Sequence, residues 1–214
     1  MRAFSNEELK QLSDQKTTKS YKKGEVIFEE GDYLKGVYCV RYGISKLSKL
    51  SPNGKDQIIK FVSNGEVLGQ RSVVAQESAN LKAVAINDME VCFIPKEFIL
   101  KSLKSNPDYT VELLRDMAHE LKEADDVIVN MSQKPVKQRV AEALLHLKNN
   151  FGEDKDGFLN ITLSREDIAN LVGTATESCI RILSEYKKEQ LLETAGKKIK
   201  LLNPSKLKHI AHGV

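Results

Sequence analysis

Residues 163–186 read LSREDIANLVGTATESCIRILSEY and form the most informative segment of the chain. Its first half is typical of a short, capped helix. Ser164 and Asp167 have the spacing of a capping box, in which each side chain accepts a hydrogen bond from the other residue's backbone N–H group. Gly173 readily adopts a positive φ, so the helix is expected to end there. The apolar face between these limits consists of Ile168, Leu171 and Val172.

A second helix is predicted to begin directly after this glycine. Thr174 and Glu177 repeat the capping-box spacing, so Thr174 is expected to cap the second helix. Ala169 is small enough to let the two helices cross closely. Two capped helices joined by a glycine turn define a helix-turn-helix, a motif that inserts its second helix into the major groove of DNA. The face predicted to pack on the first helix consists of Cys179, Ile182, Leu183 and Tyr186.

The opposite face of the second helix carries groups that suit contact with base edges. Arg181 can donate two hydrogen bonds to guanine, and Glu177, four residues earlier, can accept one from cytosine. The alternative is a weak surface ion pair between these two side chains, but the helix-turn-helix context favours base contact. Ile180 suits either a thymine methyl group or the core. The candidate DNA-binding residues of the two helices are Ser164, Arg165, Thr174, Thr176, Glu177, Ser178, Ile180 and Arg181.

A β-hairpin is predicted after the second helix. Apolar and alternating residues at 191–194 and 198–202 flank the turn 195–197. Lys197 and Lys198 lie at this turn, where they can approach the phosphate backbone. Such contacts raise affinity and salt dependence without reading sequence. Phe158 to Ile161 are predicted to form a further short strand before the helix-turn-helix.

The residues before about 104 favour β structure. Short apolar runs at 37–40, 58–62 and 91–94 are separated by glycines, and Gly31, Gly43, Gly54 and Gly65 recur at intervals of 11 or 12 residues. Turn signals at this interval indicate an antiparallel roll or barrel. Pro52-Asn53-Gly54 is typical of a tight turn. Residues 5–9 are expected to begin a short N-terminal helix.

Residues 106–133 are predicted to form one long helix, since neither Gly nor a second Pro interrupts it between Pro107 and Pro135. Apolar residues recur with alternating spacings of three and four, as in a coiled-coil seam. A helix packed on its own sheet is the alternative, through Val111, Leu113, Val127 and Val129. Because the helix is apolar on both a seam and a flank, we expect the seam to face a twin helix in a homodimer. The seam residues are Leu114, Met117, Leu121, Ala124, Ile128 and Met131.

Composition is that of an ordinary globular chain. The 214 residues are 41% hydrophobic and 29% charged, and no apolar run is long enough to span a bilayer. Residues 1–135 carry 20 basic and 20 acidic side chains, and residues 136–214 carry 13 and 10. This bias suits a polyanion partner, although a random scatter of surface charge accounts for it equally well. The cysteines, Cys39, Cys92 and Cys179, are few and widely separated, which favours a reducing cytoplasm. No secretory signal is recognised.

A glycine-punctuated roll, a long helix and a winged helix-turn-helix, in this order, resemble the CRP/FNR superfamily of bacterial transcription factors. The similarity is carried by 23–32 (KGEVIFEEGD), 65–69 (GEVLG) and 177–181 (ESCIR). It implies an α+β fold with a β-roll effector domain of the cyclic-nucleotide-binding, jelly-roll type (1–104), a dimerisation helix (105–134) and a winged helix-turn-helix (135–214). It also implies a palindromic DNA site and RNA polymerase as a partner.

The resemblance leaves the effector open. Members that bind cyclic nucleotide carry an Arg-Ser pair for the cyclic phosphate, and Ala79-Asn80 stands in its place here. In members that bind cyclic AMP, a polar pair in the middle of the long helix reaches the base of the nucleotide. Ala124-Asp125 stands in place of that pair here. Cyclic AMP is therefore disfavoured. The clustered N-terminal cysteines of the iron–sulfur branch are missing, so no iron–sulfur cluster or other metal site is expected, and His119 is expected to face solvent rather than bind haem. The candidate effector-pocket residues are Gly65, Glu66, Leu68, Gly69, Asn80, Lys82 and Asp125.

Two other classes of function are alternatives to a DNA-binding regulator. A small-ligand-binding module acting on a protein partner would share the roll, but it would not need the helix-turn-helix at 163–186. An enzyme would need a nucleophile with its base, a metal cluster or a phosphate-binding loop, and no such motif is found. The sequence thus predicts a homodimeric, sequence-specific DNA-binding regulator.

Overall fold

The computed structural model describes residues 4, 6–51 and 54–213. The chain divides into two compact units, residues 1–123 and 124–214. Within the described residues, no helix is both long enough and apolar enough to cross a bilayer. The limits of 1–104, 105–134 and 135–214 drawn from the sequence stay predictions.

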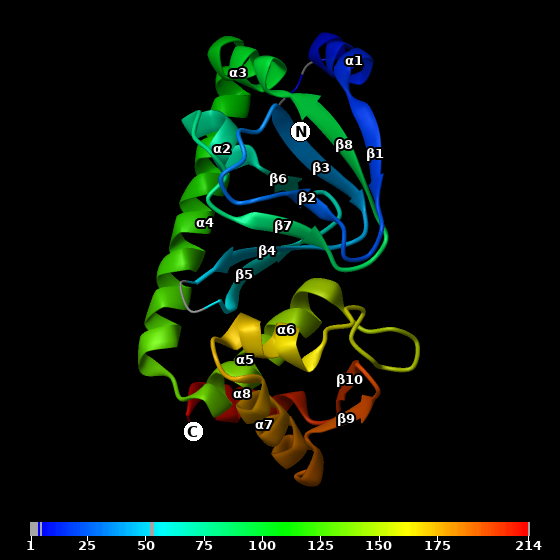
Figure 1. Ribbon diagram of the computed structural model, residues 1–214, viewed down its shortest axis with the longest axis vertical. Coiled ribbons are helices and arrows are strands. Elements are labelled where there is room, and N and C mark those ends of the chain that lie inside the picture. Colours follow the sequence, from blue (N-terminus) through cyan, green and yellow to red (C-terminus); the bar gives the residue numbers. More distant parts are fainter. Residues whose placement is uncertain (1–3, 5, 52–53, 214) are drawn as a thin grey trace. The chain divides into compact units, whose positions relative to one another are not determined.

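The first unit is built around two four-stranded antiparallel sheets (Figure 1). The first has the order β1-β8-β3-β6, and the second has the order β2-β7-β4-β5. The strands are β1 (Thr17–Tyr21), β2 (Val26–Phe28), β3 (Gly36–Tyr42), β4 (Ser45–Leu50), β5 (Asp56–Val62), β6 (Val67–Leu68), β7 (Lys82–Ala85) and β8 (Met89–Pro95). Strands far apart in the chain are neighbours in both sheets, as the predicted antiparallel roll requires.

Strand β3 explains why the run at 37–40 is apolar throughout. Successive side chains on a strand point to opposite faces of the sheet. Tyr38 and Val40 belong to the core cluster shared with Phe28, Leu47 and Leu68, whereas Val37 and Cys39 belong to a second cluster on the other face. That face is covered by α1 (Asn6–Gln15), α2 (Gln70–Ala75) and α3 (Lys96–Ser105). Both faces of the strand are therefore buried. Helices α2 and α3 were not predicted.

The evenly spaced glycines do lie at turns. Gly31, Gly43, Gly54 and Gly65 all have φ between +78° and +94°. At Gly43 a Cβ atom would also lie 2.3 Å from the Cβ of Met89, so a larger residue would meet both strain and a clash. Pro52 and Asn53 of the predicted tight turn lie outside the described residues, as does Ser5 before α1.

Helix α4 (Pro107–Gln133) is continuous, as predicted. Asn106 begins it by accepting a hydrogen bond from the backbone N–H of Tyr109 at 3.0 Å. Of the flank suggested to pack on the sheet, only Leu113 is buried, whereas Val111, Val127 and Val129 are exposed. The large aliphatic residues of the seam are also exposed, with fractions of 61% for Leu114, 65% for Leu121 and 66% for Ile128. Met117 and Met131 are half-buried, and Ala124 is exposed.

The second unit is helical with one hairpin. It contains α5 (Val136–Phe151), α6 (Arg165–Val172), α7 (Thr176–Lys188), β9 (Leu192–Ala195), β10 (Lys198–Leu201) and α8 (Pro204–His212). Its core is assembled from all of these elements, with Leu144, Ile168 and Leu207 fully or almost fully buried. The strand predicted at 158–161 is wrong, because Phe158 and Leu159 form isolated bridges only. Helix α8 was not predicted.

Candidate nucleic-acid interface

Helix α6 begins with the predicted capping box. The Ser164 Oγ accepts a hydrogen bond from the backbone N–H of Asp167 at 2.9 Å, and Asp167 Oδ2 accepts from the backbone N–H of Ser164 at 3.2 Å. Gly173 ends the helix with φ of +64°, in the left-handed region. The start and the end of α6 are therefore confirmed.

The predicted cap of α7 is wrong. The N-cap residue is Ala175, and no side chain caps this helix. Thr174 precedes this N-cap residue. Its backbone N–H donates to the carbonyl of Ala169, and this hydrogen bond closes the end of α6. The first turn of α7, with Thr176 and Ser178, therefore keeps backbone N–H groups without a side-chain acceptor, and such groups favour phosphate.

The two faces of α7 are sharply different. Cys179, Ile182, Leu183 and Tyr186 are buried, as predicted. Glu177 and Arg181 are exposed, and neither forms an ion pair or hydrogen bond with any residue that the structure describes. The alternative of a surface ion pair between them is therefore not realised. Ile180 is 46% exposed, which places it on the outer face and not in the core.

The hairpin after α7 forms as an antiparallel pair, β9 with β10, with Gly196 and Lys197 in the turn. Lys197 is exposed. Lys198 is held differently, because its Nζ lies 3.2 Å from Asp154 Oδ2. Arg165 was predicted to contact DNA, but it is half-buried and its Nη2 donates to the carbonyl of Gly196 at 3.1 Å. Its role in this structure is to join the start of α6 to the turn of the hairpin.

The candidate effector residues lie in different surroundings within the described part of the chain. Glu66 accepts hydrogen bonds from the backbone N–H and the hydroxyl of the nearby Ser63, at 2.7 and 3.0 Å. Leu68 is fully buried in the core, and Lys82 pairs with Glu29 at 3.0 Å. The remaining candidates are spread over turns and an exposed helix face, namely Gly65, Gly69 and Asp125.

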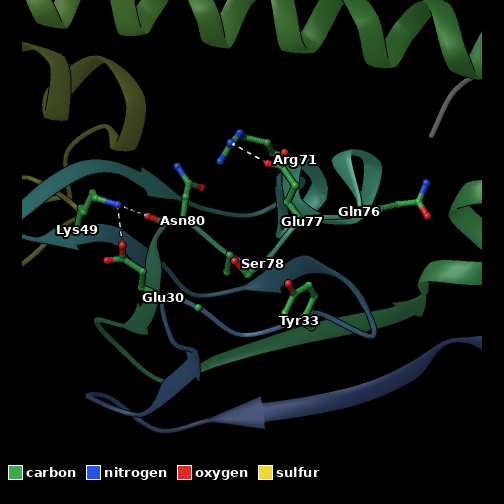
Figure 2. A pocket seen from close by; sticks show the side chains of 10 residues that line it. Glu30, Tyr33, Lys49, Arg71, Gln76, Glu77, Ser78 and Asn80 are labelled. Carbon is green, nitrogen blue, oxygen red and sulfur yellow. Dashed lines mark hydrogen bonds and ion pairs between the residues drawn. The ribbon is translucent and has the colours of Figure 1, made fainter.

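Asn80 is the one effector candidate that lines the open cavity of about 450 Å³ shown in Figure 2. Two cationic side chains reach this cavity, and each has a carboxylate partner. Lys49 Nζ lies 2.6 Å from Glu30, and Arg71 Nη2 lies 3.6 Å from Glu77. The four charges cancel, so the cavity lacks the excess positive charge that a phosphate would favour. Arg71 and Glu77 were not identified from the sequence, since α2 and the loop after it were not predicted.

The thiols lie in the core. Cys39 and Cys92 are directly opposite each other on β3 and β8, and Cys179 is buried on α7. Burial raises the pKa of the Cys39 and Cys179 thiols to about 11. Among the described residues, no three His, Cys, Asp or Glu side chains are grouped as metal ligands.

Comparison with known proteins decides the family. Residues 18–106 match the cyclic nucleotide-binding domain, and residues 138–210 match the Crp-like helix-turn-helix domain. The transcriptional activator protein Anr of Pseudomonas protegens is 31% identical over 195 residues, which cover 90% of this chain and 79% of that protein. The chain belongs to the CRP/FNR family. It is a DNA-binding transcriptional regulator of the CRP/FNR type, and the family consists of regulators and not of enzymes.

Other CRP/FNR proteins agree with this assignment. Electron transport regulator A of Shewanella oneidensis is 31% identical, over 95% of this chain and 82% of its own. The solved structure of FixK2 from Bradyrhizobium japonicum superposes with a TM-score of 0.82 at 29% identity, covering 91% of this chain and 96% of FixK2. The resemblance inferred from the glycine motifs and the helix-turn-helix is therefore confirmed, as is the α+β fold class.

Proposed function

We propose that this CRP/FNR protein acts as a homodimer that binds a two-fold symmetric DNA site and reads it with α7. The observation that carries the proposal is the asymmetry of α7. One face is buried in the core of the unit, whereas Glu177 and Arg181 on the other face are exposed and have no partner among the described residues. A guanidinium and a carboxylate left in this state can use their full hydrogen-bonding capacity on base edges.

The groups around α7 divide into base-reading and phosphate-binding sets. Arg181 supplies a bidentate donor for guanine, and Glu177 supplies an acceptor for cytosine. Ile180 is exposed beside them and suits a thymine methyl group. Contacts to phosphate position the protein without reading sequence. The residues assigned to phosphate are Thr174, Thr176, Ser178 and Lys197.

Homodimerisation is proposed through the seam of α4. Leu114, Leu121 and Ile128 are each more than three-fifths exposed on one continuous helix. Exposed large aliphatic residues at alternating spacings of three and four are stabilised when a second helix covers them. A dimer with a two-fold axis also presents two α7 helices, and so matches a palindromic site.

The effector is proposed to differ from cyclic AMP. Ala79, which stands in place of the charged arginine fork of cyclic-nucleotide binders, is buried and carries no side-chain donor, and Asn80 stands in place of the serine. The neighbouring cavity is balanced in charge. We further propose a cytoplasmic activator that contacts RNA polymerase, since Anr is named a transcriptional activator.

Selection of bound duplexes from random DNA, with and without cell extract, tests the proposal. Purified protein is expected to enrich a palindrome whose half-sites contain G·C pairs, with centres about one helical turn apart. Enrichment that needs extract would identify an effector requirement, to be tested with the fractionated extract. Enrichment of no motif under either condition, or of a motif that lacks two-fold symmetry, would overturn the proposal.

A further inference from the structure

The loop that joins α5 to α6 lies against the hairpin. The backbone N–H of Leu159 donates to the carbonyl of Ile199 at 2.8 Å, and Phe158 forms a bridge with Lys200. Strand β10 therefore has this loop on one side and β9 on the other. A carboxylate in the loop is thereby brought next to the predicted phosphate-binding lysines.

That carboxylate, Asp154, is held rigidly by its own loop. Its Oδ1 accepts hydrogen bonds from the backbone N–H groups of Asp156 and Phe158, at 3.0 and 2.9 Å. The backbone N–H of Asp154 donates to the carbonyl of Phe158 at 2.7 Å. These contacts engage Oδ1 and leave Oδ2 directed to the ammonium group of Lys198, 3.2 Å away. The hydrogen bond from Phe158, with a smaller contribution from Lys198, lowers the pKa of this carboxyl.

The two adjacent lysines of the hairpin consequently differ. The ammonium group of Lys198 lies between Asp154 and the ring of Phe158, whose centroid is 5.6 Å from Nζ. Lys197 is exposed and has no partner among the described residues. The positive charge of Lys198 is thus already balanced within the protein, whereas the charge of Lys197 is not.

We propose that Asp154 is a built-in counterion of Lys198, which competes with DNA phosphate and so weakens sequence-independent binding by the hairpin. This inference rests on the proposed DNA interface. It makes Asp154 a positioning residue that attenuates affinity and touches no base. Because the ion pair is half-exposed, it is weak enough to exchange when a phosphate approaches.

The physical basis is the release of counterions from DNA. Each lysine that neutralises a phosphate releases cations, and the logarithm of affinity then falls with the logarithm of salt concentration by about 0.9 per contact. When Lys198 leaves Asp154 for a phosphate, the freed carboxylate lies beside the DNA and attracts a cation. That uptake opposes the release, so Lys198 adds little to the salt dependence of the native protein.

The test is Asp154→Asn, measured as binding to a random-sequence duplex over a range of salt concentrations. The asparagine keeps the Oδ1 acceptor for the loop and replaces the charged Oδ2 with a neutral NH2 group, which cannot pair with Lys198. For each bound subunit we expect a salt slope steeper by about 0.9 and, at 0.1 M salt, an affinity about 2- to 8-fold higher. The matched control is Asp156→Asn, which makes the same change of charge two residues away and is expected to have a much smaller effect.

Lys198 provides the second arm of the test. In the Lys198→Ala background, Asp154→Asn is expected to have no more effect than Asp156→Asn. In the native background, Lys197→Ala is expected to lower the slope by about 0.9, and Lys198→Ala by much less. This last comparison does not depend on whether the Asp154 variant folds.

Several results would overturn the inference. One is an equal effect of the two Asn substitutions, another is a gain that persists without Lys198, and a third is an equal loss for the two lysines. If Lys197→Ala lowers the slope and Asp154→Asn behaves like its control, the DNA interface stands and the counterion role fails. If no variant changes the slope and no motif is selected, the proposed function itself fails.

Discussion

The phenol oxygen of Tyr186 lies 2.6 Å from the backbone carbonyl oxygen of Lys137, and its O–H donates to that carbonyl. The two residues belong to α7 and α5 and are separated by 49 positions. Tyr186 is fully buried, and the Lys137 ammonium group lies 5.8 Å from the centroid of its ring. This contact fixes the C-terminal half of the proposed recognition helix to the body of its unit.

Removing this hydrogen bond tests its contribution. Tyr186→Phe removes the buried hydrogen bond from the phenol to the carbonyl of Lys137, so we expect the free energy of unfolding to fall by about 1–2 kcal/mol. Urea unfolding measures this as a lower midpoint at unchanged slope. Tyr42→Phe, on a largely exposed tyrosine, is the control and is expected to leave the midpoint in place. Equal midpoints for the two variants would mean that the buried hydrogen bond adds no net stability.

Arg181 is predicted to carry sequence specificity. Arg181→Ala is expected to weaken binding to the selected palindrome by about 1–3 kcal/mol per subunit, with a much smaller effect on a random duplex. Arg181→Lys keeps the charge but loses the bidentate fork, so it is expected to lose most of the same specificity. Titrations of both duplexes at one salt concentration provide the measurement. Equal losses on the two duplexes would show that Arg181 contacts phosphate and not bases.

The α4 seam is predicted to hold the dimer. Leu121→Glu places like charges on facing helices, so we expect sedimentation at the mass of one 24.0 kDa chain. Leu50→Glu, on an equally exposed leucine of β4, is the control and is expected to sediment at twice that mass. Sedimentation of both variants at twice the mass of one chain would exclude the seam as the dimer interface.

Cys179 is predicted to make stability fall at high pH. Its thiol ionises near 9 when free, and burial raises its pKa to about 11, so the unfolded chain loses its proton first. The stabilising contribution is therefore complete below pH 9 and is lost as the pH rises through 11. The loss is on the order of 2 kcal/mol. It is measured as the difference in unfolding free energy between the native protein and Cys179→Ala at pH 8 and pH 11. A difference that does not change with pH contradicts the prediction.

Much of the second unit could be predicted because its signals are local. The capping box of Ser164 and Asp167 and the left-handed turn at Gly173 involve residues within a few positions of each other. The apolar periodicity of α7 likewise depends on spacing along one helix, and the four residues that it marks are all buried. One local rule failed where a second local contact competed with it. Thr174 has the spacing of a cap, but its backbone is used to close α6.

Several short helices were missed. Helices α2, α3 and α8 have at most 10 residues each, so few positions reveal an amphipathic pattern. The apolar stretch at 158–161 was interpreted as a strand, whereas its residues form isolated bridges. Whether a stretch pairs as a strand depends on the neighbouring strand, and the sequence of the stretch does not contain that information.

The antiparallel roll, the long helix, the helix-turn-helix and the family were predictable from the sequence, because all of these are recorded in spacing and residue type. Which charges are available to a ligand depends on contacts that form when the chain folds. Arg165 is joined to the carbonyl of Gly196, Lys198 is paired with Asp154, and Arg181 is left without a partner among the described residues. The partner of a charged side chain is set by short-range contacts between residues that are distant in the chain. Whether a charged side chain is free to bind a ligand is therefore settled only when folding brings it next to its partner.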